Sequence, residues 1–541
     1  MATQVIVRPE LAQPPTAAHT SRRPDAGPIA QAAIRHLRGD LAGALECLAG
    51  VGADLETPDL LRARGYIQLE LNDFAGAEHS YSAAADQDPE CVENWFQWGY
   101  CLHKLGELTQ ALKAFEKAAS LGSDWIEVPL ARSVCHLGLK QYEKAIEKAE
   151  DCLKVSPSYT AALFTKAVAL HLTWNLDQAC ELYAQVVDLD PACKQARMNL
   201  ITAGIQRKKF DLVQFHADRL LASDPENTLA VEGLAVAAFA REDYVTARAQ
   251  YARLTELAPE QVEHWLNLGI AQRRLSALAD ALPCFVKARE LRPDSIHAHT
   301  HLAETAWDLK DYITAHTTYE AAVAKWPERE DLTLSLSHVF EEMELPHDAE
   351  TVCVNYTKAT KDKEQVWFRL GYLQLQRNAA SESATSFENA LAIRPDWPEA
   401  EVNLALAYIA AGDLDSAATK LTSLLGRKPG HIEATKGLAT IALARNEDEK
   451  ALDLHAELIE LGEKTPDVYY NCGVLAQNLN RLDDAVRFYR EAIALRKNFP
   501  EALLNLGHAL KVIGNDEHAR SLWIPALELN PELSLNYFRR R

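Results

Sequence analysis

The chain has 541 residues, of which 48% are hydrophobic and 25% are charged, and its formal net charge is −21. This composition is that of a globular protein and excludes general disorder. The 77 acidic residues outnumber the 56 basic ones. This excess argues against nucleic acid and against an anionic membrane surface as partners, since both attract basic faces, and it favours a basic protein or peptide partner.

The first 57 residues lack the regular pattern that follows them. Residues 1–27 carry four prolines and no hydrophobic periodicity, which predicts a disordered N-terminal arm. They contain no basic stretch followed by an apolar core, so no secretory signal is predicted, and no apolar run is long enough for a transmembrane helix. The ten cysteines form no CxxC pair, which favours reduced thiols and a cytoplasmic location. Residues 28–57 predict a degenerate capping repeat.

Residues 58–533 repeat with a period of 34 and contain fourteen units without insertion or deletion. Position 8 of a unit is small in 13 cases, position 20 is Ala in 12, and position 32 is Pro in 10. Each unit has two blocks of apolar residues at helical spacing, separated by a polar break, which predicts two amphipathic helices. Small residues are expected where the two helix axes approach, and Pro is expected to end the second helix.

This pattern resembles the tetratricopeptide repeat. In the unit that starts at residue 262 the family's positions are matched by Trp265, Leu268, Gly269, Ala281, Phe285, Ala288 and Pro293. The resemblance implies an all-α solenoid, a right-handed superhelix of antiparallel helix pairs. It also implies that the first helices line a concave groove, into which positions 2, 5, 6, 9, 12 and 13 of each unit point.

Position 6 carries an asparagine in five units, namely Asn199, Asn267, Asn403, Asn471 and Asn505. This series is similar to the asparagine ladder in the repeat half of O-linked N-acetylglucosamine transferases, which implies that the amides hold the backbone of an extended peptide. An amide offers two donors and an acceptor for that purpose. The alternative interpretation is that each asparagine bonds to its own helix or to water. No transferase domain follows, so sugar transfer is not implied.

Four further residues are candidates for the same groove: His297, His301, Arg369 and Lys436. The two histidines are four residues apart on one helix face, a spacing that can chelate a metal, with Glu263 or Asp331 as a third ligand. The alternative is a solvated polar patch, and we predict no metal and no cofactor. Position 2 is acidic in nine units. This pattern indicates either an acidic stripe that binds a basic ligand or acidic side chains that interact favourably with the dipole of their own helix.

The motifs of common enzyme classes are absent from the sequence. The favoured function is therefore a non-catalytic scaffold that binds an extended peptide or partner segment in its groove. One alternative is the substrate-recognition subunit of a glycosyltransferase-like system with its catalytic domain on another chain, and another is a structural assembly factor. Residues 534–541 form a short basic tail, and the apolar last helix before it predicts self-association through the C-terminal repeat.

Overall fold

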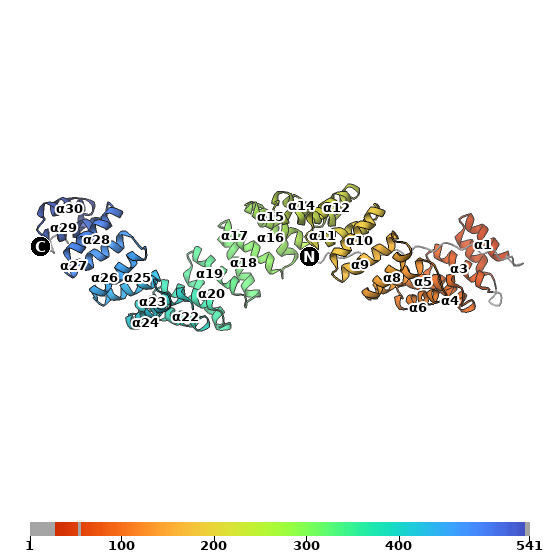
Figure 1. Ribbon diagram of the computed structural model, residues 1–541, viewed down its shortest axis with the longest axis horizontal. Coiled ribbons are helices and arrows are strands. Elements are labelled where there is room, and N and C mark those ends of the chain that lie inside the picture. Colours follow the sequence, from red (N-terminus) through yellow and green to blue (C-terminus); the bar gives the residue numbers. More distant parts are fainter. Residues whose placement is uncertain (1–26, 52–55, 536–541) are drawn as a thin grey trace. The chain divides into compact units, whose positions relative to one another are not determined.

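The computed structural model describes residues 27–51 and 56–535, which contain thirty α-helices and no strand (Figure 1). The chain divides into two compact units, residues 1–292 and residues 293–541. The predicted disordered arm lies outside the described residues except for Gly27, which begins α1, and most of the predicted basic tail also lies outside them. The all-α prediction is confirmed.

The helices alternate between the first and the second member of each repeat. The predicted capping repeat contains α1 Gly27–Leu37 and α2 Leu41–Ala49. The first helices that follow are α3 Pro58–Glu70, α5 Val92–Lys104, α7 Glu127–Gly138, α9 Thr160–Leu172, α11 Lys194–Gln206, α13 Thr228–Ala240, α15 Val262–Arg274, α17 Ile296–Asp308, α19 Glu330–Glu342, α21 Glu364–Gln376, α23 Pro398–Ala411, α25 Ile432–Ala444, α27 Pro466–Asn478 and α29 Pro500–Val512.

The second helices are α4 Phe74–Gln87, α6 Leu108–Ser120, α8 Tyr142–Val155, α10 Leu176–Leu189, α12 Phe210–Ser223, α14 Tyr244–Leu257, α16 Leu278–Leu291, α18 Tyr312–Lys325, α20 Pro346–Ala359, α22 Ala380–Ile393, α24 Leu414–Arg427, α26 Asp448–Glu460, α28 Leu482–Leu495 and α30 Asp516–Leu529. A short 3₁₀ turn, Pro531–Leu533, follows the last of them. First helices begin every 34 residues, with one exception of a single residue at α7.

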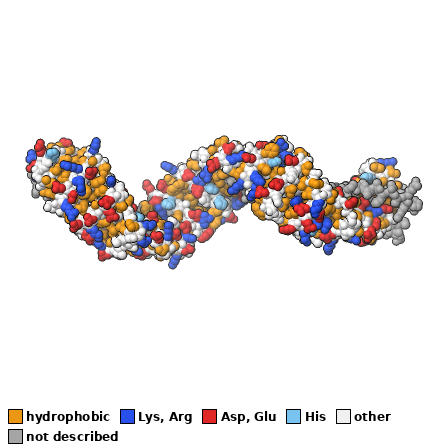
Figure 2. All heavy atoms as spheres, viewed as in Figure 1, with side chains coloured by type: hydrophobic (Ala, Val, Ile, Leu, Met, Phe, Trp, Pro, Cys, Tyr) orange, Lys and Arg blue, Asp and Glu red, His pale blue; other side chains and the backbone are white. Residues whose placement is uncertain are grey.

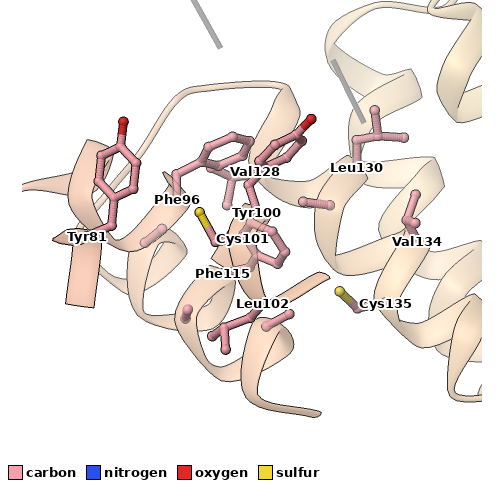
Figure 3. Packing of buried hydrophobic residues seen from close by; sticks show 14 of the residues in the cluster. Tyr81, Phe96, Tyr100, Cys101, Leu102, Phe115, Val128, Leu130, Val134 and Cys135 are labelled. Atoms are coloured by element: carbon pink, nitrogen blue, oxygen red, sulfur yellow. The ribbon is translucent and has the colours of Figure 1, made fainter. Parts of the chain in front are cut away.

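In six units the residue at position 8 is a glycine that packs against an aromatic ring at position 24 of the same unit. A Cβ added to Gly269 would lie 2.7 Å from the Phe285 ring, and one added to Gly99 would lie 2.7 Å from the Phe115 ring. Both rings are fully buried, and Figure 3 shows Phe115 within its cluster. The sequence prediction of a close helix approach at this position is therefore confirmed, and the ring is the group that requires it.

The turn between the two helices of a unit contains a left-handed residue. Position 15 has a positive φ in every one of the fourteen units, and the residues are Asn72, Gly106, Lys140, Trp174, Lys208, Glu242, Ser276, Lys310, Glu344, Asn378, Gly412, Asn446, Asn480 and Gly514. The most unusual is Trp174, with φ of 63° and 75% of the side chain exposed, because a bulky residue is disfavoured in this conformation. Most residue types at this position give no signal of a positive φ, so the conformation was not predicted from the sequence.

Helices contact their neighbours along the chain. Among the described residues of each unit, helices pack against the next helix in sequence or against the next but one. The next-but-one contacts all join first helices, for example α7 with α9 and α11 with α13 in one unit, and α19 with α21 and α23 with α25 in the other. The first helices therefore lie side by side from α5 to α13 in one unit and from α19 to α25 in the other, and each also packs against second helices.

We predict that alanine destabilises the fold where it replaces a position 8 glycine that faces a ring, and stabilises the fold where it replaces a glycine on an open helix face. Gly269→Ala places its methyl group against Phe285 and should destabilise the chain by about 1–3 kcal/mol. Gly426→Ala is the control, because a Cβ there meets nothing within 4 Å, and it should stabilise by about 0.4–1 kcal/mol. Urea denaturation followed by circular dichroism measures both, and equal shifts of the two midpoints would contradict the assignment.

Candidate functional site

Three positions of the first helices recur in register along each unit, and the rings at the first of them, for example Phe96 and Phe368, pack against Phe115 and Phe387 of the second helices. We call positions 5, 6 and 9 of the first helices the first-helix row. In α19, α21, α23 and α25 the side chain at position 9 is exposed, and these four residues are His338, Tyr372, Leu406 and Thr440. They come from successive repeats of one unit, so they offer a continuous accessible surface of mixed polar and apolar chemistry.

The five asparagines predicted at position 6 differ in what they bind. Asn199 is buried, with 1% of it exposed, and the Nδ2 of Asn505 donates to the Tyr470 hydroxyl at 3.0 Å. The Nδ2 of Asn403 donates to a backbone carbonyl one turn earlier in its own helix. Asn471 lies 3.4 Å from a nitrogen of His455. Only Asn403 bonds to its own helix, as the alternative interpretation expects, whereas Asn471 and Asn505 contact side chains of neighbouring helices.

Asn267 is the exception among these asparagines. It is half-buried in α15, and its amide makes no side-chain hydrogen bond to any residue that the structure describes. It lies in the unit of residues 1–292, whereas Asn403, Asn471 and Asn505 lie in the other unit. The asparagines are therefore divided between the two units, and their role in peptide binding stays a prediction.

Arg369 is a structural anchor within the first-helix row. Only 8% of it is exposed, and its Nε donates to the Ser337 hydroxyl at 3.1 Å while a terminal nitrogen lies 2.6 Å from a Glu341 carboxylate oxygen. These bonds tie α21 to α19. The guanidinium also lies 5.9 Å from the centre of the Tyr372 ring, which fixes that exposed aromatic side chain. Partial burial and the neighbouring Arg369 lower the pKa of His338.

Of the remaining predicted groove residues, Lys436 and His301 lie close to acidic side chains. Lys436 bridges Glu433 and Glu463 with 3.0 Å to each, and these two bonds raise the pKa of the lysine. His301 lies 3.5 Å from Glu304, and His297 is exposed. Throughout residues 27–51 and 56–535 there is no cluster of three or more His, Cys, Asp or Glu side chains able to hold a metal ion.

Five of the nine acidic residues at position 2 form ion pairs with nearby basic side chains, namely Asp59, Glu263, Asp331, Glu433 and Asp467. The carboxylate of Asp467 accepts two bonds from Arg496, at 2.8 and 3.1 Å, and that of Glu263 accepts from Arg292 at 2.9 Å. In both cases the arginine is at position 31, so the pair joins the start of the first helix to the end of the second. Figure 2 shows acidic and basic side chains interspersed on the visible face. Because these ion pairs neutralise the carboxylates, they favour a structural role of the position 2 acids over an acidic stripe that selects a basic ligand.

Four buried cysteines carry protonated thiols. All ten cysteines of the chain are free, and seven of them are buried. Burial raises the pKa of Cys101, Cys135, Cys152 and Cys472 to about 12, so these groups stay protonated thiols rather than thiolates. No described helix has both the length and the apolar character needed to cross a membrane.

Comparisons with known proteins agree with the repeat architecture. Models of the tetratricopeptide repeat match residues 62–124, 216–262, 244–296, 266–330, 408–470 and 466–499. The chain is 25% identical over 373 residues to BBSome complex member BBS4 of Bos taurus, which covers 68% of this chain and 67% of that protein. It is 25% identical over 177 residues to human Protein O-mannosyl-transferase TMTC1, which covers 32% of this chain and only 20% of that protein.

A solved structure also aligns along most of the length. It is the heterotetramer Cut9–Hcn1 of the APC/C, which is 14% identical, covers 89% of this chain and 96% of that chain, and has a TM-score of 0.33.

The pairing of Arg369 with Glu341 yields a stability prediction. Glu341→Gln removes the charge that balances a guanidinium of which 8% is exposed, and it should destabilise the chain by about 1–3 kcal/mol, because a buried charged donor then lacks its ionic partner. Glu382→Gln removes an acid from an exposed ion pair of Arg377 and should change stability by less than about 1 kcal/mol. Urea midpoints measure both, and similar shifts would argue against the anchoring role.

Proposed function

Because the chain belongs to the tetratricopeptide repeat family, we propose that it is a non-catalytic scaffold that binds an extended segment of a partner protein. The proposed binding surface is the first-helix row of α19, α21, α23 and α25. The observation that carries the proposal is the exposure of His338, Tyr372, Leu406 and Thr440 at the same position of four successive first helices.

The chemistry of this surface suits an extended polypeptide. Tyr372 and Leu406, 38% and 41% exposed, offer apolar contact area on adjacent first helices, while His338 and Thr440 offer hydrogen-bonding groups on either side. Adjacent packed helices lie about 8–10 Å apart, and an extended chain covers that distance in roughly three residues. A partner segment can therefore place one side chain in three against each successive helix, with its backbone facing the polar groups between them.

The comparison with BBSome complex member BBS4 supports a role inside a multiprotein assembly, since that relative is named as a member of a complex and aligns with 68% of this chain. A partner contacted along many repeats gains affinity from many weak contacts on a preformed surface. A second candidate function is substrate recognition for a glycosyltransferase-like system. It is supported by the similarity to Protein O-mannosyl-transferase TMTC1, which extends over 20% of that protein.

The proposed surface predicts a selective loss of partner binding. Leu406→Asp places an unpaired charge in the middle of the row and should lower capture of the partner from a lysate of the native host at least about tenfold, because a buried unpaired charge costs several kcal/mol. The matched control is Ile313→Asp, which makes the same kind of change at an exposed residue of the second helix α18. Affinity capture with quantitative mass spectrometry compares the two variants with wild type.

Equal loss of partner capture in both variants, or its retention in both, would show that the partner does not bind at the first-helix row. Circular dichroism of each variant establishes that a lost partner does not reflect unfolding. A captured glycosyltransferase that depends on Leu406 would favour the second candidate function over a general scaffold.

We also propose self-association through the last repeat. The large apolar side chains Val512, Ile513, Ile524 and Leu529 are each at least 47% exposed on α29 and α30 or directly after α29. Clustered exposed apolar residues mark interaction surfaces. Light scattering should show a mass that rises with concentration, and Ile524→Asp should return it to that of a 60.1 kDa monomer. A monomer at all concentrations for wild type would contradict the proposal.

A further inference from the structure

Three of the fourteen first helices carry a charged residue at position 5 of the row: Arg62 on α3, Glu232 on α13 and Lys436 on α25. Two of these charges are balanced inside the chain. Arg62 contacts two aspartate carboxylates, and Lys436 contacts two glutamate carboxylates. Glu232 forms no ion pair or hydrogen bond through its side chain with any residue that the structure describes. Its charge therefore has no partner within the described part of the chain.

Glu232 lies on a face of α13 that is turned away from the core formed with α14. On the core side, Val231 and Ala235 belong to a hydrophobic cluster that includes residues of the second helix α14. Residues four apart share one side of a helix, so Glu232, Val236 and Ala240 lie together on another face. The first two of these are half-buried, and Ala240 is exposed. A ligand can therefore approach the carboxylate from outside the core.

The surroundings of Glu232 disfavour an isolated negative charge. Partial burial raises the pKa of its carboxyl group, and the electrostatic effect of His264 on the next first helix, α15, opposes this rise only in part. Glu263 on α15 adds a like charge that also raises this pKa, although Arg292 pairs with Glu263 at 2.9 Å. A carboxylate in such a setting is stabilised by a cation that binds to it directly.

An amide without a hydrogen-bond partner lies on the neighbouring first helix. Asn267, at position 6 of α15, is half-buried, and its side chain bonds to no described residue. The other four asparagines at position 6 each contact a group of the chain itself. Polar groups without a partner thus occur at positions 5 and 6 of the successive first helices α13 and α15, and the electrostatic effect of His264 on Glu232 links these two helices.

We propose that Glu232 and Asn267 form a subsite for a lysine or arginine of an extended partner segment. The ammonium or guanidinium group of that residue pairs with the Glu232 carboxylate, and the Asn267 amide, with its two donors and one acceptor, bonds to the backbone of the segment. Val236 offers apolar area to the aliphatic stem of the basic side chain. The net charge of −21 favours the approach of a basic partner. The subsite rests on the proposed scaffold function and adds a second binding surface, in the unit of residues 1–292.

The unbound protein provides the first test, because the charge of Glu232 should lower stability until a partner binds. A raised pKa in the folded chain means that the folded state holds this proton more tightly than the unfolded state, so stability is lost as the pH rises above the unfolded value of about 4.3. Glu232→Gln carries no such charge. Its urea midpoint should exceed that of wild type at neutral pH, and the difference should vanish towards about pH 4.

The matched control is Glu256→Gln, which removes an exposed carboxylate of α14 that forms no ion pair with a described residue. This variant should keep the wild-type urea midpoint at both pH values. A midpoint of Glu232→Gln at or below that of wild type at neutral pH would show that the chain itself already stabilises the charge, and it would overturn the proposal.

Selection from a phage library of short random peptides tests the chemistry of the partner segment. Wild type and Glu232→Gln serve as separate baits. Peptides selected on wild type should be enriched in lysine or arginine at one shared position, and this enrichment should be lost on Glu232→Gln. Equal enrichment of basic residues on both baits, or no selected peptide on wild type, would overturn the proposal.

Fluorescence anisotropy of a selected peptide, synthesised with a fluorescent label, then measures the pairing directly. Glu232→Gln should weaken binding at least about tenfold, and so should glutamine in place of the basic residue of the peptide, because each change leaves the opposite charge unpaired. The two changes together should weaken binding little more than either one alone. Asn267→Ala should weaken binding roughly threefold to tenfold, whereas Glu256→Gln should leave the affinity unchanged.

Effects of the two charge changes that simply multiply would overturn the subsite, because independent groups behave in this way. Selected peptides whose binding depends on Leu406 but not on Glu232 would remove the subsite and leave the proposed scaffold surface standing. Peptides that depend on Glu232 but not on Leu406 would do the reverse.

Discussion

The packing of an aromatic ring against a backbone without a side chain is the contact that organises six of the fourteen repeats. Phe285 fills the space that a Cβ at Gly269 would occupy, and Phe115 does the same at Gly99. This contact fixes how the two helices of a repeat rotate about their axes, because any rotation would drive the ring into the neighbouring backbone. In these six repeats the contact therefore keeps positions 5, 6 and 9 on the same side of the first helix, and the 34-residue period places these positions in register along the chain.

The side chains of the row recur at the same three positions of each repeat, but they differ in whether a ligand could reach them. Arg369 illustrates one cause, since its charge is used to join α21 to α19 through Ser337 and Glu341, and a residue engaged in this way holds the surface together rather than contacting a partner. Thr202 and Thr440 illustrate the other, because the same side chain at the same position is covered in one unit and accessible in the other. Function along a repeat array is thus decided by what surrounds each copy of a position.

The sequence predicted those features that arise within a single repeat. The helix pair, the small residue at Gly269 and the ring at Phe285 follow from local periodicity and from volume, and both can be seen along the chain. The partners of Asn505 and Arg369 could not be predicted, because Tyr470 and Glu341 reach them from the preceding repeat. The left-handed residue of each turn was missed for another reason: Trp174, Lys140 and Glu242 are poor indicators of positive φ, and only Gly106, Gly412, Gly514 and the asparagines at this position carry the usual sequence signal.

Contacts that extend only to adjacent and next-but-one helices have a mechanical consequence. Within each unit a tensile load would pass through the interfaces between repeats one after another, since no described contact joins distant repeats in parallel. The weakest interface then sets the force at which extension begins, and each subsequent repeat releases its own length in turn. Under load, such a chain would lengthen in small increments as single repeats separate. It would recover as the helix pairs stack again one at a time.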